Sequence, residues 1–179
     1  MEALPPRLAR LLFGTPASHD GLVVVSTRYE FSQHFRVPAE AAFKWCTDYD
    51  PRDYALMGNK GVRKATWVSD DTVILEDTLY PAGRAVTRRK VVKIDRERMS
   101  YFNFHLTGPN KSSLYFYRIT PDGEGESRLD YTGYELSYPK RGPTKKRMDS
   151  AAKADEAART LEWGRLAKAM EKELRVVRR

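Results

Sequence analysis

The stretch FRVPAEAAFKWCTDYDPRDY, residues 35–54, decides the fold, because it breaks a strand with two short helical segments. A strand-like run ends at Val37, and Pro38 then opens a segment with helical spacing. Proline suits the first position of a helix, where its fixed φ is already helical and its missing N–H is not needed. The apolar positions that follow this spacing are Ala39, Ala42, Phe43 and Cys46. We therefore expect a short helix directly after the first strand.

A second short helix is expected within DPRDYALMG, residues 50–58. Asp50 is the predicted N-cap, Pro51 the first helical residue and Gly58 the residue that ends the helix. The strand before both helices spans residues 22–37, which begin apolar and then alternate, as a half-buried strand does. Its predicted apolar face carries Tyr29, Phe31, Phe35 and Val37.

Six more strands and one long helix are expected after the two short helices. The turn sequences SDD, PAG, DRER, GPNK and PDGEGE separate the strands. The predicted strands are 62–69, 72–80, 84–94, 99–107, 112–120 and 127–138. Residues 144–177 are rich in Ala, Leu, Glu, Lys and Arg and contain no proline, which predicts a helix. Its apolar stripe contains Met148, Ala152, Trp163, Leu166, Met170, Leu174 and Val177.

This order of elements, together with VPAEAAFKWCTDYDP at the first strand-to-helix junction, resembles the START-like (SRPBCC, helix-grip) superfamily over residues 22–177. That group includes polyketide cyclase/dehydrase-like proteins, hydrophobic-ligand carriers and lipid-transfer domains. The resemblance implies an α+β helix-grip fold, in which a seven-stranded curved antiparallel sheet wraps around the long C-terminal helix. A ligand cavity lies between sheet and helix in that fold, and the two short helices close one end. We expect residues 1–20 to form an arm or short helix and residues 21–179 a single domain.

The composition indicates a globular chain without a resident metal or cofactor. Of 179 residues, 41% are hydrophobic and 31% charged, and no apolar run approaches the roughly 20 residues that span a bilayer. The N-terminus lacks the apolar core of a signal peptide, so we expect a cytoplasmic protein. Cys46 is the only cysteine, which excludes an intrachain disulfide, and a small buried residue is a better interpretation of it than a reactive thiol. No Cys/His or carboxylate spacing suggests a metal site.

Positive charge is in excess, with a net charge of +8. It is concentrated in PKRGPTKKR (139–147), in residues 83–98 and in the C-terminal RVVRR. Such a surface attracts nucleic acid, anionic lipid or an acidic protein, although an ordinary solvated surface is the simpler interpretation. No nucleic-acid-binding motif is present, so nucleic acid is an unlikely partner. We hypothesise that residues 139–147 contact an anionic membrane. The sequence does not indicate an oligomeric state.

The turns predict which residues face each other across the sheet. If PAGR closes a hairpin, Asp77 faces Arg88 on one side of the sheet, and Glu76 faces Arg89 on the other. Opposite charges across an antiparallel pair contribute about 0.2–1 kcal/mol each, which supports this register. The same rule at DRER and GPNK places four aromatic residues on the face of Glu76 and Arg89, namely Phe102, Phe104, Tyr115 and Tyr117.

We take this aromatic face as the concave one, although residues 72–94 alone favour the opposite face and a β-bulge would also reverse it. An apolar pocket with a few polar groups is typical of small-molecule sites. Arg89 is expected to bind a carboxylate or phosphate group of an amphipathic ligand, and Glu76 is expected to pair with Arg89 when the pocket holds no ligand. The alternative is a packed aromatic core with an ion pair at the rim. The predicted ligand-binding residues are Glu76, Arg89, Phe102, Phe104, Tyr115, Tyr117, Trp163, Leu166 and Met170.

A catalytic role is not assigned to any residue. The acid and base candidates are Glu76, Asp77, His105 and Tyr131, and the predicted register places His105 on the outer face. No nucleophile elbow, dinucleotide fingerprint or P-loop is present. The favoured function is binding or transport of a hydrophobic or amphipathic, lipid-like or polyketide-like small molecule. The alternatives are a cyclase/dehydratase-type enzyme, and an interaction protein whose pocket is filled and whose basic surface meets an anionic partner.

Overall fold

A single antiparallel sheet and one long helix dominate the computed structural model, which describes residues 23–139 and 142–176. The sheet has seven strands in the order β1-β7-β6-β5-β4-β3-β2. The strands are β1 (Val25–Phe35), β2 (Gly61–Ser69), β3 (Thr72–Leu79), β4 (Val86–Asp95), β5 (Ser100–His105), β6 (Leu114–Pro121) and β7 (Ser127–Ser137). The helices are α2 (Ala39–Cys46), α3 (Asp53–Leu56) and α4 (Lys145–Val176), with a short 3₁₀ turn at Pro81–Gly83. The predicted helix-grip order is confirmed, and the predicted N-terminal arm lies outside the described residues.

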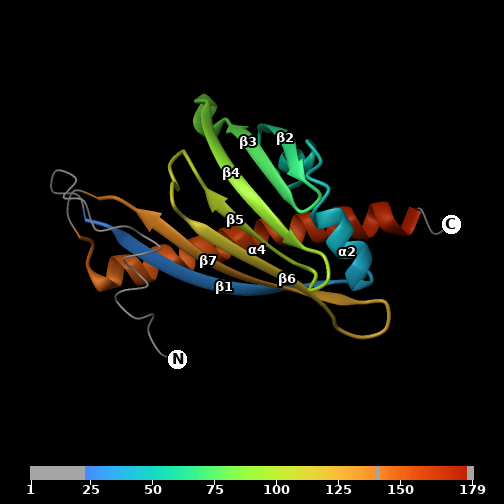
Figure 1. The fold of residues 1–179 in the computed structure, drawn as a ribbon. Coiled ribbons are helices and arrows are strands. Elements are labelled where there is room, and N and C mark those ends of the chain that lie inside the picture. The colour runs from blue at the N-terminus through green and yellow to red at the C-terminus, as the bar shows by residue number, and fades with distance from the viewer. Residues whose placement is uncertain (1–22, 140–141, 177–179) are drawn as a thin grey trace.

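Helix α4 runs along the concave face of the sheet (Figure 1). Its residues Ala167 and Met170 are buried against the sheet, together with Phe35 at the end of β1. Helix α2 covers the same end of the sheet and contributes Phe43 to this core. The apolar core therefore lies at one end of the sheet, beneath α2 and the C-terminal half of α4. In the part of the chain that is described, no helix is both long and apolar enough to cross a membrane.

Helix α3 is shorter than the sequence indicates, because a turn precedes it. Asp50 accepts a hydrogen bond from the backbone N–H of Arg52 at 2.7 Å, and its backbone oxygen accepts one from Asp53. The helix therefore begins at Asp53 rather than Pro51. Gly58 follows its last turn with φ of +81°, a left-handed conformation that glycine adopts without strain. This placement leaves α3 over the start of β2, where its side chains reach the concave face.

The predicted strand registers agree with the structure at one of three hairpins. In the β4–β5 pair Ile94 lies opposite Tyr101 rather than Met99, a shift of two residues that leaves the faces unchanged. The β5–β6 pair differs by one residue. Asp77 lies opposite Arg88 in the β3–β4 pair, as predicted. In the β5–β6 pair Tyr101 lies opposite Tyr117, whereas the predicted register paired it with Arg118. The hairpin closes where the N–H of His105 donates to the oxygen of Ser113. A slip of one residue exchanges the two faces of a strand, so β6 presents the side chains predicted for its opposite face.

The concave face is consequently the one that the sequence analysis took as the outer face of β3, β4 and β5. The prediction failed because its β5–β6 register was wrong by one residue, which placed Tyr115 and Tyr117 on the face of Phe102 and Phe104. With the observed register, Tyr115 and Tyr117 share a face with His105, and this face is buried. The concave face of the central strands carries Val73, Leu75, Asp77, Arg88, Lys90, Val92, Tyr101, Asn103, His105, Tyr115 and Tyr117.

Candidate functional site

A cavity of about 500 Å³ lies between the concave face of the sheet and helices α3 and α4. The residues of α4 on its lining are Arg159, Glu162, Trp163 and Leu166, from the middle of the helix. The opposite side consists of side chains from strands β2 to β7, and α3 covers the end near β2. Cavities that bind small molecules usually measure 300–1,000 Å³, so this one has the size of a ligand site.

One wall of the cavity consists of tyrosines. The rings of Tyr101 and Tyr117 stack with centroids 4.4 Å apart, and Trp163 approaches Tyr117 from α4 with centroids 5.8 Å apart. Tyr115 and Tyr131 continue the same surface, with centroids 6.2 Å apart. Burial raises the pKa of each of these tyrosine hydroxyls, so the rings stay neutral at physiological pH. We call Tyr101, Tyr115, Tyr117, Tyr131 and Trp163 the aromatic wall.

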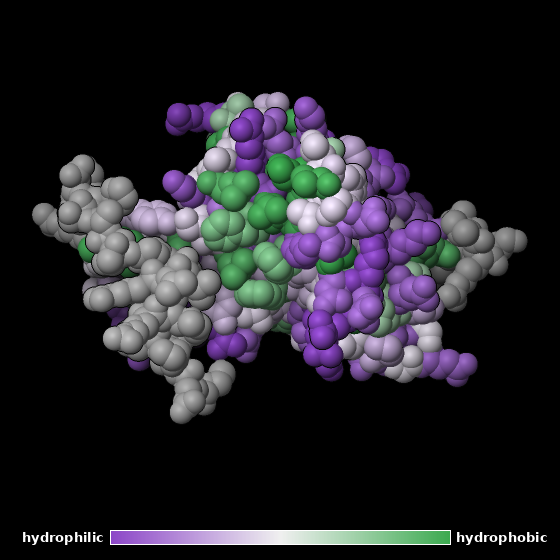
Figure 2. Space-filling view, viewed as in Figure 1, coloured by the Kyte–Doolittle hydropathy of each residue, from purple (hydrophilic) through white to green (hydrophobic). Residues whose placement is uncertain are grey.

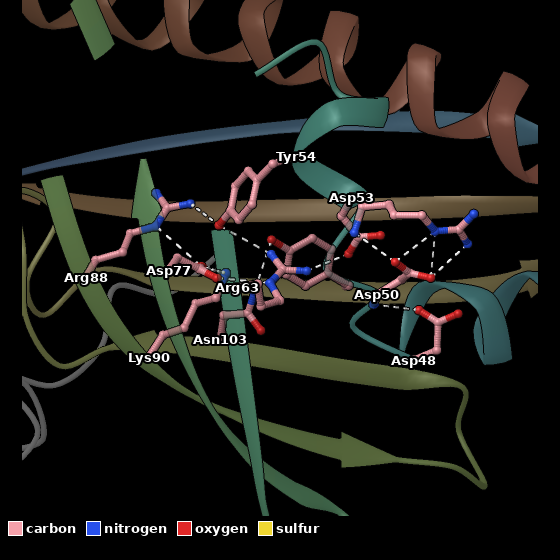
Figure 3. Close-up of polar contacts among 11 residues, drawn as sticks. Asp48, Asp50, Asp53, Tyr54, Arg63, Asp77, Arg88, Lys90 and Asn103 are labelled. Carbon is pink, nitrogen blue, oxygen red and sulfur yellow. Dashed lines mark hydrogen bonds and ion pairs between the residues drawn. The ribbon is translucent and has the colours of Figure 1, made fainter. Parts of the chain in front are cut away.

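The other wall is charged and is organised around a buried carboxylate (Figure 3). Asp77 has no exposed surface and accepts a hydrogen bond from Arg63 Nε at 2.9 Å. Its second oxygen lies 2.9 Å from Lys90 Nζ and 3.6 Å from Arg88 Nε. A carboxylate excluded from water is stable only when it is paired, and here three cations from β2 and β4 surround it.

Helix α3 closes this charged wall from above. The hydroxyl of Tyr54 accepts hydrogen bonds from Arg88 Nη2 at 3.2 Å and from Arg63 Nη2 at 3.3 Å. The neighbouring Asp53 forms an ion pair with Arg63. The first turn of α3 therefore fixes the two guanidinium groups, which explains why a short helix must follow α2. Asp53, Tyr54, Arg63, Asp77, Arg88 and Lys90 are called the Asp77 cluster below.

Burial and charge act in opposite directions on the acids and bases of the cluster. Burial would raise the pKa of Asp77, but Lys90 and Arg63 hold it well below its usual range, so Asp77 is ionised. Burial, together with the neighbouring Arg63 and Arg88, lowers the pKa of Lys90 despite its contact with Asp77. Burial raises the pKa of Asp53 to about 6. The protonated form of Lys90 is thus disfavoured by burial and by the two arginines, and a further anion nearby would favour it.

Two more polar residues of β5 face the cavity beside the cluster. His105 lies directly opposite Lys90 and is 4% exposed, and its Nδ1 has no hydrogen-bond partner among the described residues. Burial, with Lys90 and Arg88 nearby, lowers the pKa of His105 to about 3, so its imidazole is neutral at physiological pH. Asn103 donates to the hydroxyl of Tyr117 at 3.4 Å, but its buried Oδ1 is unpaired within the described chain.

Four of the predicted site residues line the cavity, namely Tyr115, Tyr117, Trp163 and Leu166. Met170 is fully buried in the apolar core and is not part of the lining. The remaining four predicted residues, Glu76, Arg89, Phe102 and Phe104, lie on the convex face.

The convex face has its own ion pair and its own aromatic surface. Glu76 pairs with Arg89 at 2.6 Å, which is the rim ion pair that the sequence analysis kept as its alternative. Figure 2 shows apolar residues gathered over β4, β5 and β6 on this face. Phe102 and Phe116 are paired across β5 and β6 on the same side of the sheet, with ring centroids 6.0 Å apart. The side chains of these residues therefore point away from the cavity, although their neighbours in sequence line it.

Sequence reasoning missed Arg63, Arg88, Lys90 and Asn103 as cavity residues and placed Asp77 and His105 on the outer face. A usable signal was present. Val73, Leu75 and Leu79 alternate with Asp77 on one side of β3, so an apolar strand face carries a single carboxylate. A charge within such a face is either a functional group or one end of a buried ion pair, because it is costly to bury alone.

Two other predicted features do not belong to the Asp77 cluster, although Cys46 lines the same cavity. Burial raises the pKa of the Cys46 thiol, as expected for a structural cysteine rather than a reactive one. Lys145, Lys146 and Arg147 are exposed in the first turn of α4, and the twelve residues from Arg147 to Arg159 correspond to about 18 Å of helix. The basic turn is thus separated from the cavity, and its contact with an anionic membrane stays a prediction. Among the described residues no group of His, Cys, Asp and Glu is arranged to hold a metal ion.

Comparison with known proteins agrees with this architecture. The sequence model of the family described as polyketide cyclase/dehydrase and lipid transport matches residues 26–171. Among solved structures, the Zhui aromatase/cyclase from Streptomyces sp. R1128 is similar, with a TM-score of 0.65 and 14% identity over 87% of this chain and 97% of that one. A START superfamily protein from Mycobacterium smegmatis gives a TM-score of 0.60 and 12% identity, covering 84% and 99% of the two chains. The protein TTHA0849 from Thermus thermophilus gives a TM-score of 0.63 and 13% identity, covering 80% and 96%. No curated protein sequence matches the chain.

Proposed function

Because the chain belongs to the polyketide cyclase/dehydrase and lipid transport family, we propose that it binds a hydrophobic or amphipathic small molecule between the sheet and α4. The observation that carries this proposal is the cavity of about 500 Å³ with an aromatic wall. Apolar lining with a few convergent polar groups is how small-molecule sites are usually built. The family description includes lipid transport, which supports a carrier.

The proposal is tested with the neutral fluorescent probe N-phenyl-1-naphthylamine, whose emission rises in apolar surroundings. Leu166→Trp fills the cavity from α4, because Leu166 is 7% exposed and lies on the lining. Leu161→Trp is the matched control, since Leu161 is on the same helix but is 58% exposed. We expect saturable probe binding that Leu166→Trp weakens at least about tenfold, equivalent to about 1.4 kcal/mol. Leu161→Trp should leave it unchanged. Binding that both variants leave intact would place the probe on the convex apolar face and contradict the proposal.

Native mass spectrometry of the freshly purified chain gives a second measurement. A carrier is expected to retain a co-purified small molecule, and Leu166→Trp should then show only the bare mass. A bare mass for the unaltered chain together with no probe binding would favour the interaction-protein alternative, in which the cavity has no ligand.

A cyclase- or dehydratase-type activity is the second candidate, and His105 is the observation that favours it. Its unpartnered Nδ1 is on the cavity wall, where a general base must lie to reach a bound substrate. A pKa of about 3 makes it a weak base in the free chain, and an anionic substrate would raise that pKa. We expect His105→Ala to slow any turnover of a poly-β-carbonyl thioester at least about hundredfold, the usual contribution of a general base. Turnover is followed by mass spectrometry, with His34→Ala, an exposed histidine, as control. Equal turnover by both variants would exclude His105 as the base.

A further inference from the structure

The Asp77 cluster contains more positive than negative charge. Arg63, Arg88 and Lys90 are its cations, and Asp53 and Asp77 are its carboxylates. Among the described residues no third carboxylate pairs with these three cations within 4.0 Å. The nearby pair of Arg159 and Glu162, at 2.8 Å on α4, is balanced in itself and supplies no spare anion. With Lys90 protonated, the Asp77 cluster therefore carries one positive charge in excess.

The excess charge is associated with incomplete hydrogen bonding on the same wall. Arg88 Nε is buried and makes no hydrogen bond within the described structure, since its contact with Asp77 is an ion pair at 3.6 Å. The unpaired Nδ1 of His105 belongs to the strand next to it, directly across from Lys90. Buried polar atoms in folded proteins are nearly always paired, and an unpaired one destabilises the fold. Several of them on one cavity wall indicate that a polar group of a ligand completes the site.

The aromatic wall begins directly beside these atoms. The ring of Tyr115 lies 4.9 Å from that of His105, and Asn103 contacts the hydroxyl of Tyr117. A ligand whose anion lies at Arg88 and Lys90 would therefore extend its body over the tyrosine rings. Because the whole cavity holds about 500 Å³, one small molecule can contact the cations with its anionic end and the aromatic wall with its apolar body.

We propose that the cavity binds an amphipathic carboxylic acid, with its carboxylate held by Arg88 and Lys90 and its apolar body against the aromatic wall; this rests on the proposed function. The ligand carboxylate supplies the missing negative charge and accepts a hydrogen bond from the unpaired Nε–H of Arg88. Arginine suits this role because its planar guanidinium keeps its charge when buried and presents donors in a fixed geometry. Asp77 positions Arg88 and Lys90, and it lies behind them without touching the ligand.

The test compares a matched acid and amide, 2-naphthoic acid and 2-naphthamide, by isothermal titration calorimetry on the full chain. The two probes have the same ring system and differ in charge. We expect the acid to bind at least about tenfold more tightly, because hydrogen bonds to charged groups are the stronger ones. Arg88→Met should remove this preference by weakening the acid alone. Arg89→Met is the matched control, because Arg89 is the next residue of the same strand, faces the convex side and is 62% exposed.

A second measurement needs no variant and does not depend on whether Arg88→Met folds. The pKa of the His105 imidazole is followed by NMR in the free chain and with each probe. An anion within a few ångströms of His105 should raise its pKa by about 1 or more, whereas the neutral amide should leave it unchanged. Lys90→Met provides an independent variant, for which we expect the same loss of preference for the acid.

The possible failures are distinguishable. If N-phenyl-1-naphthylamine binds but the acid has no advantage over the amide, the carboxylate site is wrong while the binding cavity stands. The carboxylate site is also wrong if the tighter binding of the acid survives both Arg88→Met and Lys90→Met, or if Arg89→Met abolishes it. If no probe binds at millimolar concentration, the proposed function fails and the carboxylate site fails with it.

Discussion

Asp77→Asn is the most informative perturbation of stability, because it removes one charge and almost no volume. Asp77 has no exposed surface and its carboxylate lies 2.9 Å from both Arg63 Nε and Lys90 Nζ. Removing one member of a buried ion pair usually costs 3–5 kcal/mol, because the other charge stays buried and unpaired. We expect the lower end, about 3 kcal/mol at pH 7, since Arg63 keeps Asp53 and Lys90 can release its proton. For a chain of this length the melting temperature should fall by about 6–12 °C.

The assay is urea unfolding followed by circular dichroism, with Glu76→Gln as the matched control. Glu76 is the adjacent residue on the convex side, and its side chain is 38% exposed in its pair with Arg89. Exposed ion pairs contribute about 0–1 kcal/mol, so the control should lose less than about 1 kcal/mol. The double variant Asp77→Asn/Lys90→Met should recover part of the loss, because it removes a cation that has lost its partner.

The loss should also depend on pH in one direction. Because the folded-state pKa of Asp77 is lowered, its stabilising contribution is fully present above about pH 4 and is lost as the pH falls further. The gap between the unaltered chain and Asp77→Asn should therefore shrink below about pH 4, where Asp77 itself takes up a proton. A loss below about 1 kcal/mol at pH 7, or a gap that does not shrink between about pH 4 and pH 2, would refute the idea that this carboxylate holds the charged wall together.

Three further predictions concern single positions. Gly164→Ala in α4 should raise the free energy of unfolding by about 0.5–1 kcal/mol in urea titration, because the added methyl meets only Gln33 Oε1 at 3.8 Å; a decrease would mean that this position needs glycine. Gly133→Ala in β7 should lower it by about 1–3 kcal/mol in the same titration, since the new Cβ would lie 3.0 Å from the ring of Tyr29; an unchanged value would show that the ring can move. The thiol of Cys46 is only partly buried but should react with Ellman's reagent more slowly than free cysteine, because its surroundings raise its pKa; reaction at the rate of free cysteine would contradict this.

Local patterns in the sequence predict the elements well, because each depends on neighbouring residues. The helical spacing after Pro38 and the proline-free run to Val176 correspond to α2 and α4. The charge pairs of Asp77 with Arg88 and of Glu76 with Arg89 gave the β3–β4 register, since the charges are complementary on both sides of the sheet. These features need no knowledge of the rest of the fold.

The concave face could not be predicted because it depends on whether the loop between β5 and β6 has an odd or an even number of residues. The residues between His105 and Ser113 form a loop with two left-handed positions, Gly108 at φ +93° and Ser112 at φ +69°. Ser112 carries no signal in the sequence that predicts this conformation, and one residue more or less exchanges the faces of β6. The error then moved the tyrosines of β6 to the face of Phe102 and Phe104, which made the wrong face the more aromatic one.

The change in side-chain character along β3 and β4 explains how one sheet face provides both a core and a site. At the α2 end the concave face presents Val73, Leu75 and Val92, all fully buried, and further along the same strands it presents Asp77 and Lys90. Well-packed apolar residues in place of a buried ionic cluster are often neutral for stability or stabilising, so stability alone does not explain the charged half. Arg88 and Lys90 line the cavity, whereas Val73, Leu75 and Val92 do not. The position of the Asp77 cluster is therefore better explained by recognition of a molecule in the cavity than by the needs of the fold.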